Sequence, residues 1–342
     1  MTYTRPALAA VLLALWAGGL PASNAMNPDL SVNGLFLYVH DSSPTAATTG
    51  LQVQEIEAQV ASDIDPYFRG TAIVTMAPLA GGGWDIAPEE AYVETLGLPG
   101  LTLRAGKFRA ALGRQNALHT HAYPFIDATL ANQVLLGDGI DAVGLSAAWM
   151  APTPWFVELT AQGFNASGSP LFNSPIAEEM AGLLTLKQLW DLSDAATLEL
   201  ACSWMEGRDA GEDLSQLADA AVTMKWRGDN SHALIVAGEY LRSELPSASS
   251  SPLADRGGLS AWAQWQFSRR WWLQGRMEAL GVAGDLAQPA VRKYSALVAL
   301  VPTEFSGLRL QYDWIEAEVN VPEHRIMAQL NFTMGVHPAH AY

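Results

Sequence analysis

The chain has 342 residues, of which 49% are hydrophobic and only 16% are charged. Acidic residues outnumber basic ones by 35 to 19, and the net charge of −16 argues against a nucleic-acid-binding protein, which needs a basic face. The single cysteine excludes an internal disulfide, so an exported domain of this size depends on its core or on backbone pairing.

The first 25 residues have the features of a secretory signal peptide. Arg5 supplies a positive charge, residues 7–20 form an apolar stretch, and small residues lead up to Ala25. The apolar stretch is too short to cross a bilayer as a helix, and no later segment reaches about 18 uninterrupted apolar residues. We therefore predict that residues 1–25 are a cleaved signal peptide and that residues 26–342 form one domain without a transmembrane helix.

Apolar and polar residues alternate with period two through much of the remaining sequence. In LRLQYDWIE, residues 308–316, Leu310 and Tyr312 fall on one face while Arg309 and Gln311 fall on the other. The stretches LSAWAQWQF, WLQGRMEAL and RIMAQLNFT repeat the pattern. Period two is typical of β-strands with one apolar and one polar face.

The connections between these segments alternate between short and long, which allows the strands to be counted. Short turns are expected at residues 65–66, 98–100, 151–154, 191–194, 227–231, 268–270 and 302–307, and longer links near residues 40–50, 78–88, 110–140, 164–181, 206–217, 242–257, 281–290 and 318–324. Seven short turns and eight longer links join sixteen strands, the first near residues 30–39.

A soluble β-sandwich would also alternate, but three features favour a membrane barrel. The segments run about ten residues, the length of a tilted transmembrane strand. Aromatic residues gather at segment ends, as at Trp149, Trp226 and Trp271. The strict alternation of short and long connections is typical of outer-membrane barrels. We predict an all-β fold, a transmembrane antiparallel β-barrel of about 16 strands with short periplasmic turns, longer extracellular loops and a water-holding interior.

Four stretches resemble blocks found in a group of outer-membrane, porin-like proteins of Gram-negative bacteria. They are NPDLSVNG, EIEAQVASDIDPYFRG, EEAYVETLGLPGLTLRAGKF and GRQNALHTHAYPFIDATL. Members of this group carry descriptions such as predicted porin or zinc-regulated outer-membrane protein. The resemblance covers most of the chain, is clearest in residues 27–160, and implies an outer-membrane barrel without indicating a solute. One departure is the ending VHPAHAY, in which Pro338 interrupts the strand pattern before the terminal Tyr342.

The densest polar stretch of the chain lies in the third long link. In residues 113–137, Asp127 is expected to cap a short helix over residues 128–136 that ends at Gly137. Such a helix would direct Leu130 and Val134 towards a wall.

The third extracellular loop of general-diffusion porins folds inward and narrows the channel, and by this analogy we expect residues 110–140 to enter the lumen. The constriction candidates are then Arg114, Asn116, His119, His121 and Asp127. A solvated surface loop without a special role is the alternative.

The two histidines also allow a metal site as an alternative. His119 and His121 point the same way on an extended backbone, and Asp127 could add an oxygen ligand suitable for zinc. His-x-His alone is a weak signal, since neither a cysteine nor a close third histidine completes the set. No other cofactor is expected.

Strand parity assigns a set of charged side chains to the lumen. The inward-facing charges include Glu55, Glu57, Arg69, Glu94, Arg104, Glu239, Arg276, Glu278, Arg309, Asp313 and Arg325. The inward acids and bases nearly balance, so the acidic excess falls in the links, and no basic ladder suited to an anion channel is visible.

These features predict a passive channel for small hydrophilic solutes or ions in the outer membrane of a Gram-negative bacterium. The alternatives are a zinc-associated uptake or binding barrel and a closed structural or surface-binding barrel. An enzyme is not expected, because no serine or acid lies at a diagnostic spacing from a histidine. The expected partners are outer-membrane lipid, the barrel-assembly machinery and small solutes, but no nucleic acid. The oligomeric state stays open, with a homotrimer as one alternative.

Overall fold

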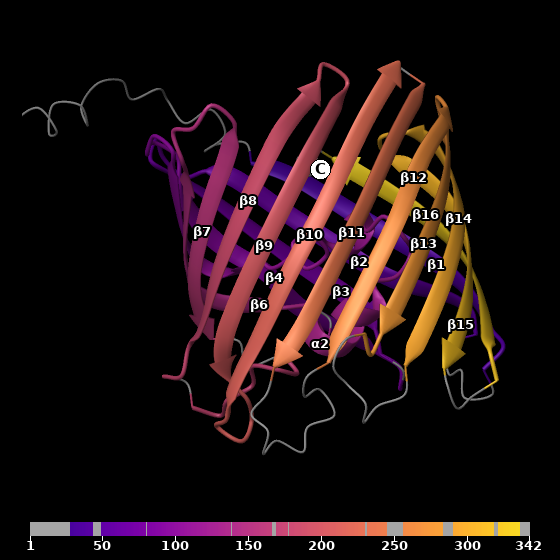
Figure 1. Ribbon diagram of the computed structural model, residues 1–342, viewed down its shortest axis with the longest axis horizontal. Coiled ribbons are helices and arrows are strands. Elements are labelled where there is room, and N and C mark those ends of the chain that lie inside the picture. The colour runs from indigo at the N-terminus through magenta and orange to yellow at the C-terminus, as the bar shows by residue number, and fades with distance from the viewer. Residues whose placement is uncertain are drawn as a thin grey trace, which may run out of the picture.

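The computed structural model describes residues 28–43, 49–79, 81–137, 139–165, 169–176, 178–229, 231–244, 256–282, 290–317 and 321–335 (Figure 1). The predicted signal peptide and the C-terminal VHPAHAY lie outside these residues. Among the described residues, no helix is long and apolar enough to cross a membrane.

The described chain forms sixteen strands and two short helical segments. The strands are β1 (Asp29–Asp41), β2 (Gly50–Asp63), β3 (Phe68–Pro78), β4 (Trp84–Thr95), β5 (Leu101–Arg109), β6 (Asp141–Met150), β7 (Phe156–Asn165), β8 (Ala181–Ser193), β9 (Ala196–Arg208), β10 (Leu214–Asp229), β11 (His232–Glu244), β12 (Gly257–Ser268), β13 (Trp271–Leu280), β14 (Val291–Thr303), β15 (Ser306–Ala317) and β16 (Glu323–Gly335). The helical segments are η1 (Thr120–Ala122) and α2 (Leu130–Leu136), both between β5 and β6.

Each strand pairs antiparallel with its neighbours in sequence, and β1 pairs with β16 to close the barrel. Closure runs over eleven residue pairs, from Ser31 opposite Gly335 to Asp41 opposite Arg325. A closed ladder leaves no strand edge without hydrogen-bond partners, which a lipid environment requires. The prediction of an all-β, sixteen-strand antiparallel barrel is confirmed.

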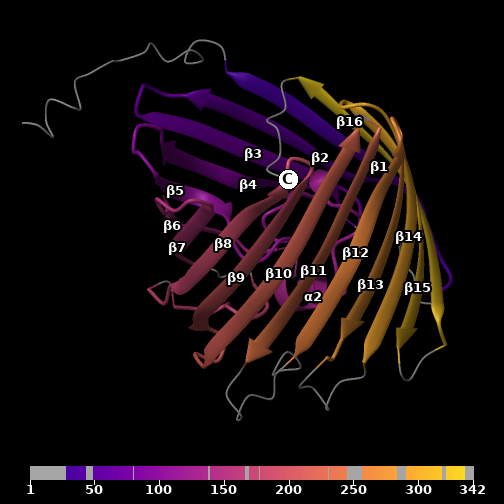
Figure 2. The ribbon, with the colours of Figure 1, turned by 45° about the horizontal axis from the view of Figure 1, so that its top comes forward.

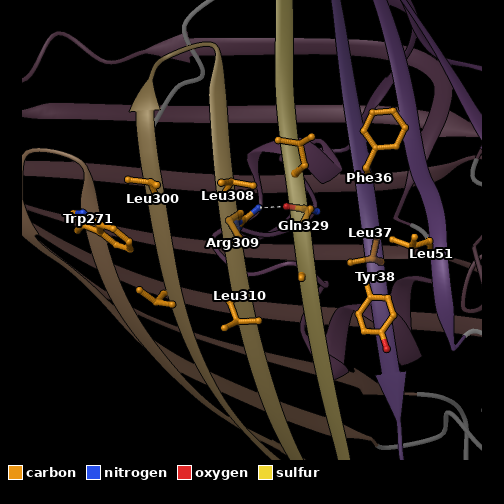
Figure 3. A pocket seen from close by; sticks show the side chains of 13 residues that line it. Phe36, Leu37, Tyr38, Leu51, Trp271, Leu300, Leu308, Arg309, Leu310 and Gln329 are labelled. Atoms are coloured by element: carbon orange, nitrogen blue, oxygen red, sulfur yellow. Dashed lines mark hydrogen bonds between the residues drawn. The ribbon is translucent and has the colours of Figure 1, made fainter.

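The two faces of the wall follow the period-two pattern. On β15, Leu308 and Leu310 are each 51% exposed, whereas Gln311 and Asp313, which point the opposite way, are fully buried. Figure 3 shows the outer wall around β15, with Leu308 and Leu310 projecting from the strand and Arg309 hydrogen-bonded across to the next strand. Because an isolated barrel exposes its apolar face, these large exposed side chains mark the surface suited to lipid.

The connections at one end of the barrel span five residues or fewer, whereas most of those at the other end are longer. The links expected near 78–88, 206–217 and 318–324 are shorter than predicted, because the strand bounds leave only residues 79–83, 209–213 and 318–322 between them. Pro88, which cannot donate a ladder hydrogen bond, fits within β4 beside a β-bulge where the β3–β4 register shifts.

The two faces predict different costs for a buried charge. Arginine in place of Leu310 should destabilise the folded barrel by about 2–4 kcal/mol, because it places a charge in the hydrocarbon layer. Arginine in place of Gln264, which bonds Gln274 on the inner side, should cost much less. Urea titrations of the protein folded in lipid vesicles would measure both free energies of unfolding. Equal costs would contradict the assignment of the two faces.

Candidate functional site

The inner segment, residues 110–140 between β5 and β6, packs against the inner face of the wall. Helix α2 contacts β11, β12 and β13. The backbone N–H of Ile126 donates to the buried side chain of Gln311 on β15 (2.8 Å), and that of Gly113 donates to Ser203 on β9 (3.4 Å). Figure 2 shows the segment inside the ring of strands. The segment therefore reaches widely separated sectors of the barrel.

The second half of the segment is held by apolar contacts. Leu135 and Leu136 on α2 are fully buried in a cluster with inward-facing side chains of the wall. The wall contributes Phe108, Phe164, Leu183, Met205, Leu217 and Leu241, from β5 and β7–β11. Full burial of such a side chain contributes about 1.5–3 kcal/mol, so this sector of the wall and α2 form a small apolar core within the barrel.

Helix α2 starts and packs differently from the prediction. Thr129, not Asp127, is the N-cap residue, and its side chain accepts a hydrogen bond from the N–H of Asn132. The buried face carries Ala131 and Leu135 rather than Leu130 and Val134. Gly137 ends the helix as predicted, with a φ of 66° that glycine adopts without strain.

Asp127 is displaced from the helix cap because it is the centre of a buried charge cluster. Its carboxylate accepts from Arg276 on β13 (2.7 Å) and from Lys293 on β14, and Gln311 adds a hydrogen bond of 2.8 Å. Burial by itself would raise the pKa of Asp127, but the positive charges of Arg276 and Lys293 outweigh burial and hold the pKa well below its ordinary value of 3.8. Glu278 accepts from the N–H of Leu130 and ion-pairs with Arg276 at 2.6 Å, so it extends the cluster.

The opposite arrangement holds at the histidines, where the wall is acidic. His119 Nδ1 lies 3.0 Å from Glu89 and 3.4 Å from Glu57, and His119 Nε2 lies 3.3 Å from Glu90. His121 Nδ1 lies 3.2 Å from the same Glu57 oxygen. Burial disfavours a charged imidazole, but the three carboxylates outweigh burial and raise the pKa of His119 to about 12. The imidazolium of His119 is thus the counter-charge of this sector.

Two β-bulges explain why so many polar side chains meet the segment here. Along a regular strand, successive side chains point to opposite faces. The register between β3 and β4 skips Glu89, so both Glu89 and Glu90 are buried on the inner side. The register between β1 and β2 skips Gln54 in the same way, and Gln54 and Glu55 both bond the inner segment, at Ile126 and Thr120. Bulges commonly redirect side chains at functional sites.

Arg114 and Asn116 are also hydrogen-bonded, Arg114 to the wall and Asn116 within the segment. The N–H groups of Arg114 and Gln115 donate to Glu239 on β11, and the Arg114 guanidinium bonds Thr223 on β10 at 3.0 Å. The Asn116 amide bonds the carbonyls of Ala110 and Ile140 and accepts from the N–H of Ile140, so it ties the two ends of the segment together. Asn116 is therefore not available to line an opening.

The three residues predicted from the sequence as metal ligands, His119, His121 and Asp127, do not lie together in the structure. Asp127 belongs to the cluster with Arg276 and Lys293, whereas His119 and His121 meet Glu57 and its neighbours. Asp127 is therefore wrong as the third ligand. Among the described residues, Glu57, Glu89 and His119 are a group whose ligand atoms all lie within 4.8 Å of one another.

The remaining inward charges named from parity form pairs along the wall. Arg104 bonds Glu94 (2.9 Å), Arg69 bonds Asp63 (3.2 Å), and Arg325 bonds Asp41 (2.8 Å). Arg309 donates to the carbonyl of Tyr123 in the segment.

Sequence reasoning missed Glu89, Glu90 and Lys293, which contact the inner segment. The bulge hid Glu89, for which the Pro88-Glu89-Glu90 run is a signal, whereas Glu90 has the same parity as Glu94 and could have been found from it. Lys293 lies on the inner face of β14, and the alternation along that strand could have revealed it.

The closed sixteen-strand barrel with a polar inner face and an apolar outer face has the fold of bacterial outer-membrane porins. The anion-selective porin from Comamonas acidovorans matches with a TM-score of 0.63 and 8% identity, over 90% of this chain and all of that one. OmpT of Vibrio cholerae, as a loop-deletion mutant, matches with a TM-score of 0.61 and 9% identity over 90% and 99%. The channel DcaP of Acinetobacter baumannii matches with a TM-score of 0.60 and 11% identity over 90% and 96%.

At the level of sequence, no protein-family model matches the chain. An uncharacterised protein of Aquifex aeolicus (strain VF5) is 27% identical, over 89% of this chain and 72% of its own length. The comparisons therefore show the fold, and the solved structures they name include a porin and an outer-membrane channel.

Replacing Asp127 by Asn should destabilise the barrel by about 3–5 kcal/mol, because it leaves Arg276 and Lys293 buried with less counter-charge. Since the folded pKa of Asp127 lies below 3.8, its contribution is present above about pH 4 and is lost as the pH falls below that value. Asp127→Asn should therefore weaken the loss of stability in acid. Urea unfolding at pH 3 and pH 7 would measure this, with exposed Asp213→Asn as the control, and identical behaviour of both variants would contradict it.

Proposed function

We propose that the protein is an outer-membrane channel for passive diffusion of small hydrophilic solutes or ions, with the inner segment as its constriction. The observation that carries the proposal is the charged inner wall together with the inner segment bound to it. A sixteen-strand barrel without such a segment would enclose a wide aqueous lumen, and a segment across it sets the narrowest part.

The constriction would be formed by the exposed surface of the segment rather than by its buried charges. Arg114, His119 and Asp127 contribute fixed charge close to the passage, but their polar atoms contact the wall. Gln133 lies on the exposed side of α2, and its side chain donates a hydrogen bond to the carbonyl of Ala128 (2.7 Å). A solute passing the helix would therefore meet Gln133.

The second candidate is a closed barrel that serves as a structural or surface-binding element. It is favoured by the anchoring of the inner segment to separate sectors of the wall, at β2 and β4, at β10 and β11, and at β13–β15. Both functions are non-enzymatic, and they differ in whether water and ions cross the barrel.

The proposed location is the outer membrane of a Gram-negative bacterium, with outer-membrane lipid against the apolar face. Export and insertion there require a cleaved signal peptide and the barrel-assembly machinery. OmpT of Vibrio cholerae has been solved in a trimer form. We extend the same assembly, a homotrimer, to this chain.

Conductance of the purified protein, refolded and inserted into a planar bilayer, would test the channel. The channel proposal expects discrete single-channel steps. Silence from protein that migrates as a folded barrel on an unheated gel would contradict it and favour the closed barrel.

A charge at position 133 should change ion selectivity, because charges act strongly at a narrow, water-poor point. Gln133→Lys should favour anions and Gln133→Glu should favour cations, by on the order of twofold in permeability ratio, with a smaller effect in high salt because of screening. Reversal potentials in a salt gradient would measure the shift. Asp213→Asn, the same change of one positive charge on an exposed link, should have little effect. Equal shifts from both positions would place the constriction elsewhere.

A further inference from the structure

The acidic sector around His119 carries more negative charge than the protein neutralises with permanent cations. Four carboxylates gather there, those of Glu55, Glu57, Glu89 and Glu90. Within this group the permanent cation is Arg109, which bonds Glu89 and also donates its backbone N–H to Glu90. The balance comes from protons on the imidazoles or on a carboxyl, or from a bound cation.

Glu57 is the least satisfied member of the group. Its side chain is 1% exposed, and neither carboxylate oxygen has a hydrogen-bond donor in good geometry among the described residues. The two histidine Nδ1 atoms lie at 3.4 Å and 3.2 Å from one Glu57 oxygen, within ion-pair distance only. A buried carboxylate held by two imidazoles in poor hydrogen-bond geometry is costly, and coordination to a metal is one of the ways in which proteins satisfy it.

The distances from His119 Nδ1 to the two carboxylate oxygens fit a small tetrahedral ion, and all three ligand atoms lie within 4.8 Å of one another. Zinc bonds of about 2.0–2.2 Å to nitrogen and oxygen place neighbouring ligand atoms about 3.3 Å apart in tetrahedral geometry. His119 Nδ1 lies 3.0 Å from a Glu89 oxygen and 3.4 Å from a Glu57 oxygen. These three residues come from the inner segment, β4 and β2, so no single hairpin supplies the set.

We propose that His119, Glu57 and Glu89 bind a divalent transition-metal ion of the zinc type, with a solvent molecule in the fourth position. Binding transfers the Nδ1 proton of His119 to solvent, and the ion then provides the positive charge that the imidazolium supplies without it. One imidazole nitrogen selects a borderline ion such as Zn²⁺ over Mg²⁺ or Ca²⁺, which prefer sites made only of oxygen.

The surrounding groups are those that a zinc site requires in its outer shell. A metal-bound histidine commonly donates its other ring N–H to a carboxylate, and His119 Nε2 lies 3.3 Å from Glu90. A ligating carboxylate is commonly hydrogen-bonded on its second oxygen, and Arg109 bonds Glu89 Oε1 while Oε2 faces His119. His121 Nδ1 lies 3.2 Å from the same Glu57 oxygen that faces His119.

The site joins the wall to the inner segment, so a bound ion would fix the segment to β2 and β4. This inference goes beyond the proposed function, because the site depends on the folded barrel and not on whether the barrel conducts.

Zinc binding to the refolded, full-length mature barrel in detergent would test the proposal. Isothermal titration with Zn²⁺ alone should give one site per chain, and Mg²⁺ or Ca²⁺ should not compete. Glu57→Gln should weaken binding by at least about 10–100-fold, and Glu90→Gln, which alters only the outer shell, by about 10–100-fold. Glu94→Gln is the matched control. Glu94 lies on β4 like Glu90 and faces inward, but it pairs with Arg104 and not with the proposed ligands.

X-ray absorption at the zinc edge on the wild-type protein provides a second measurement that does not depend on a variant folding. It should show nitrogen and oxygen ligands at about 2.0–2.2 Å, including one histidine. Absence of stoichiometric binding by the folded wild-type protein, a signal without histidine, or equal binding by Glu57→Gln and Glu94→Gln would overturn the proposal. If zinc binding fails but the protein still shows single-channel steps in the presence of a chelator, the proposed channel function remains supported.

Discussion

The need to neutralise buried charge governs how the interior of this barrel is organised. The wall places Arg276 and Lys293 together beside Glu278 and Asp313, and it places Glu57, Glu89 and Glu90 together beside Arg109. Charges removed from water are expensive unless they are well paired. The inner segment adds a further opposite charge in each place, Asp127 beside Arg276 and Lys293, and His119 beside the three glutamates. Segment and wall therefore depend on each other, and the segment is not an appendage that a bare barrel could lose without cost.

The architecture could be predicted from the sequence because membrane barrels obey simple backbone rules. Every strand must alternate, every ladder must close, and the turns at one end are short. Residues 308–316, for example, alternate clearly between apolar and polar side chains, and Leu308 and Leu310 lie on the outer face as the alternation predicts. The count of sixteen strands was therefore recoverable, even though the lengths of the links at 79–83, 209–213 and 318–322 were not. What decides such features is local hydrogen bonding, which needs no knowledge of distant residues.

The details of the site lay beyond the sequence because they depend on exceptions to those rules. A single bulge at Glu89 breaks the alternation and turns two consecutive acids inward, and a second bulge does the same for Gln54 and Glu55. Asp127 had the right residue type for a helix cap, yet Arg276 and Lys293 hold it more strongly than a backbone N–H at the helix start could. In each case a contact distant in sequence outweighed a local preference. What pointed to this region beforehand was the polar stretch in the third long link, with His119 and Asp127, and the parity of inward charges such as Glu57 and Arg276.

One part of the inner face is apolar, and this part limits where solutes could pass. Where β5 and β7–β11 face α2, the wall carries Phe164, Met205 and other apolar side chains that pack on Leu135. Water is excluded from that sector, so on the proposed function a passage cannot run between α2 and these strands. It must run along the other side of the helix, where Gln133 is exposed. The apolar core fixes where the helix sits, and the two charge clusters fix how the rest of the segment crosses the lumen. The position of the proposed passage thus follows from how the segment is anchored to the wall. A charged side chain on the segment would therefore act on solutes from a fixed position.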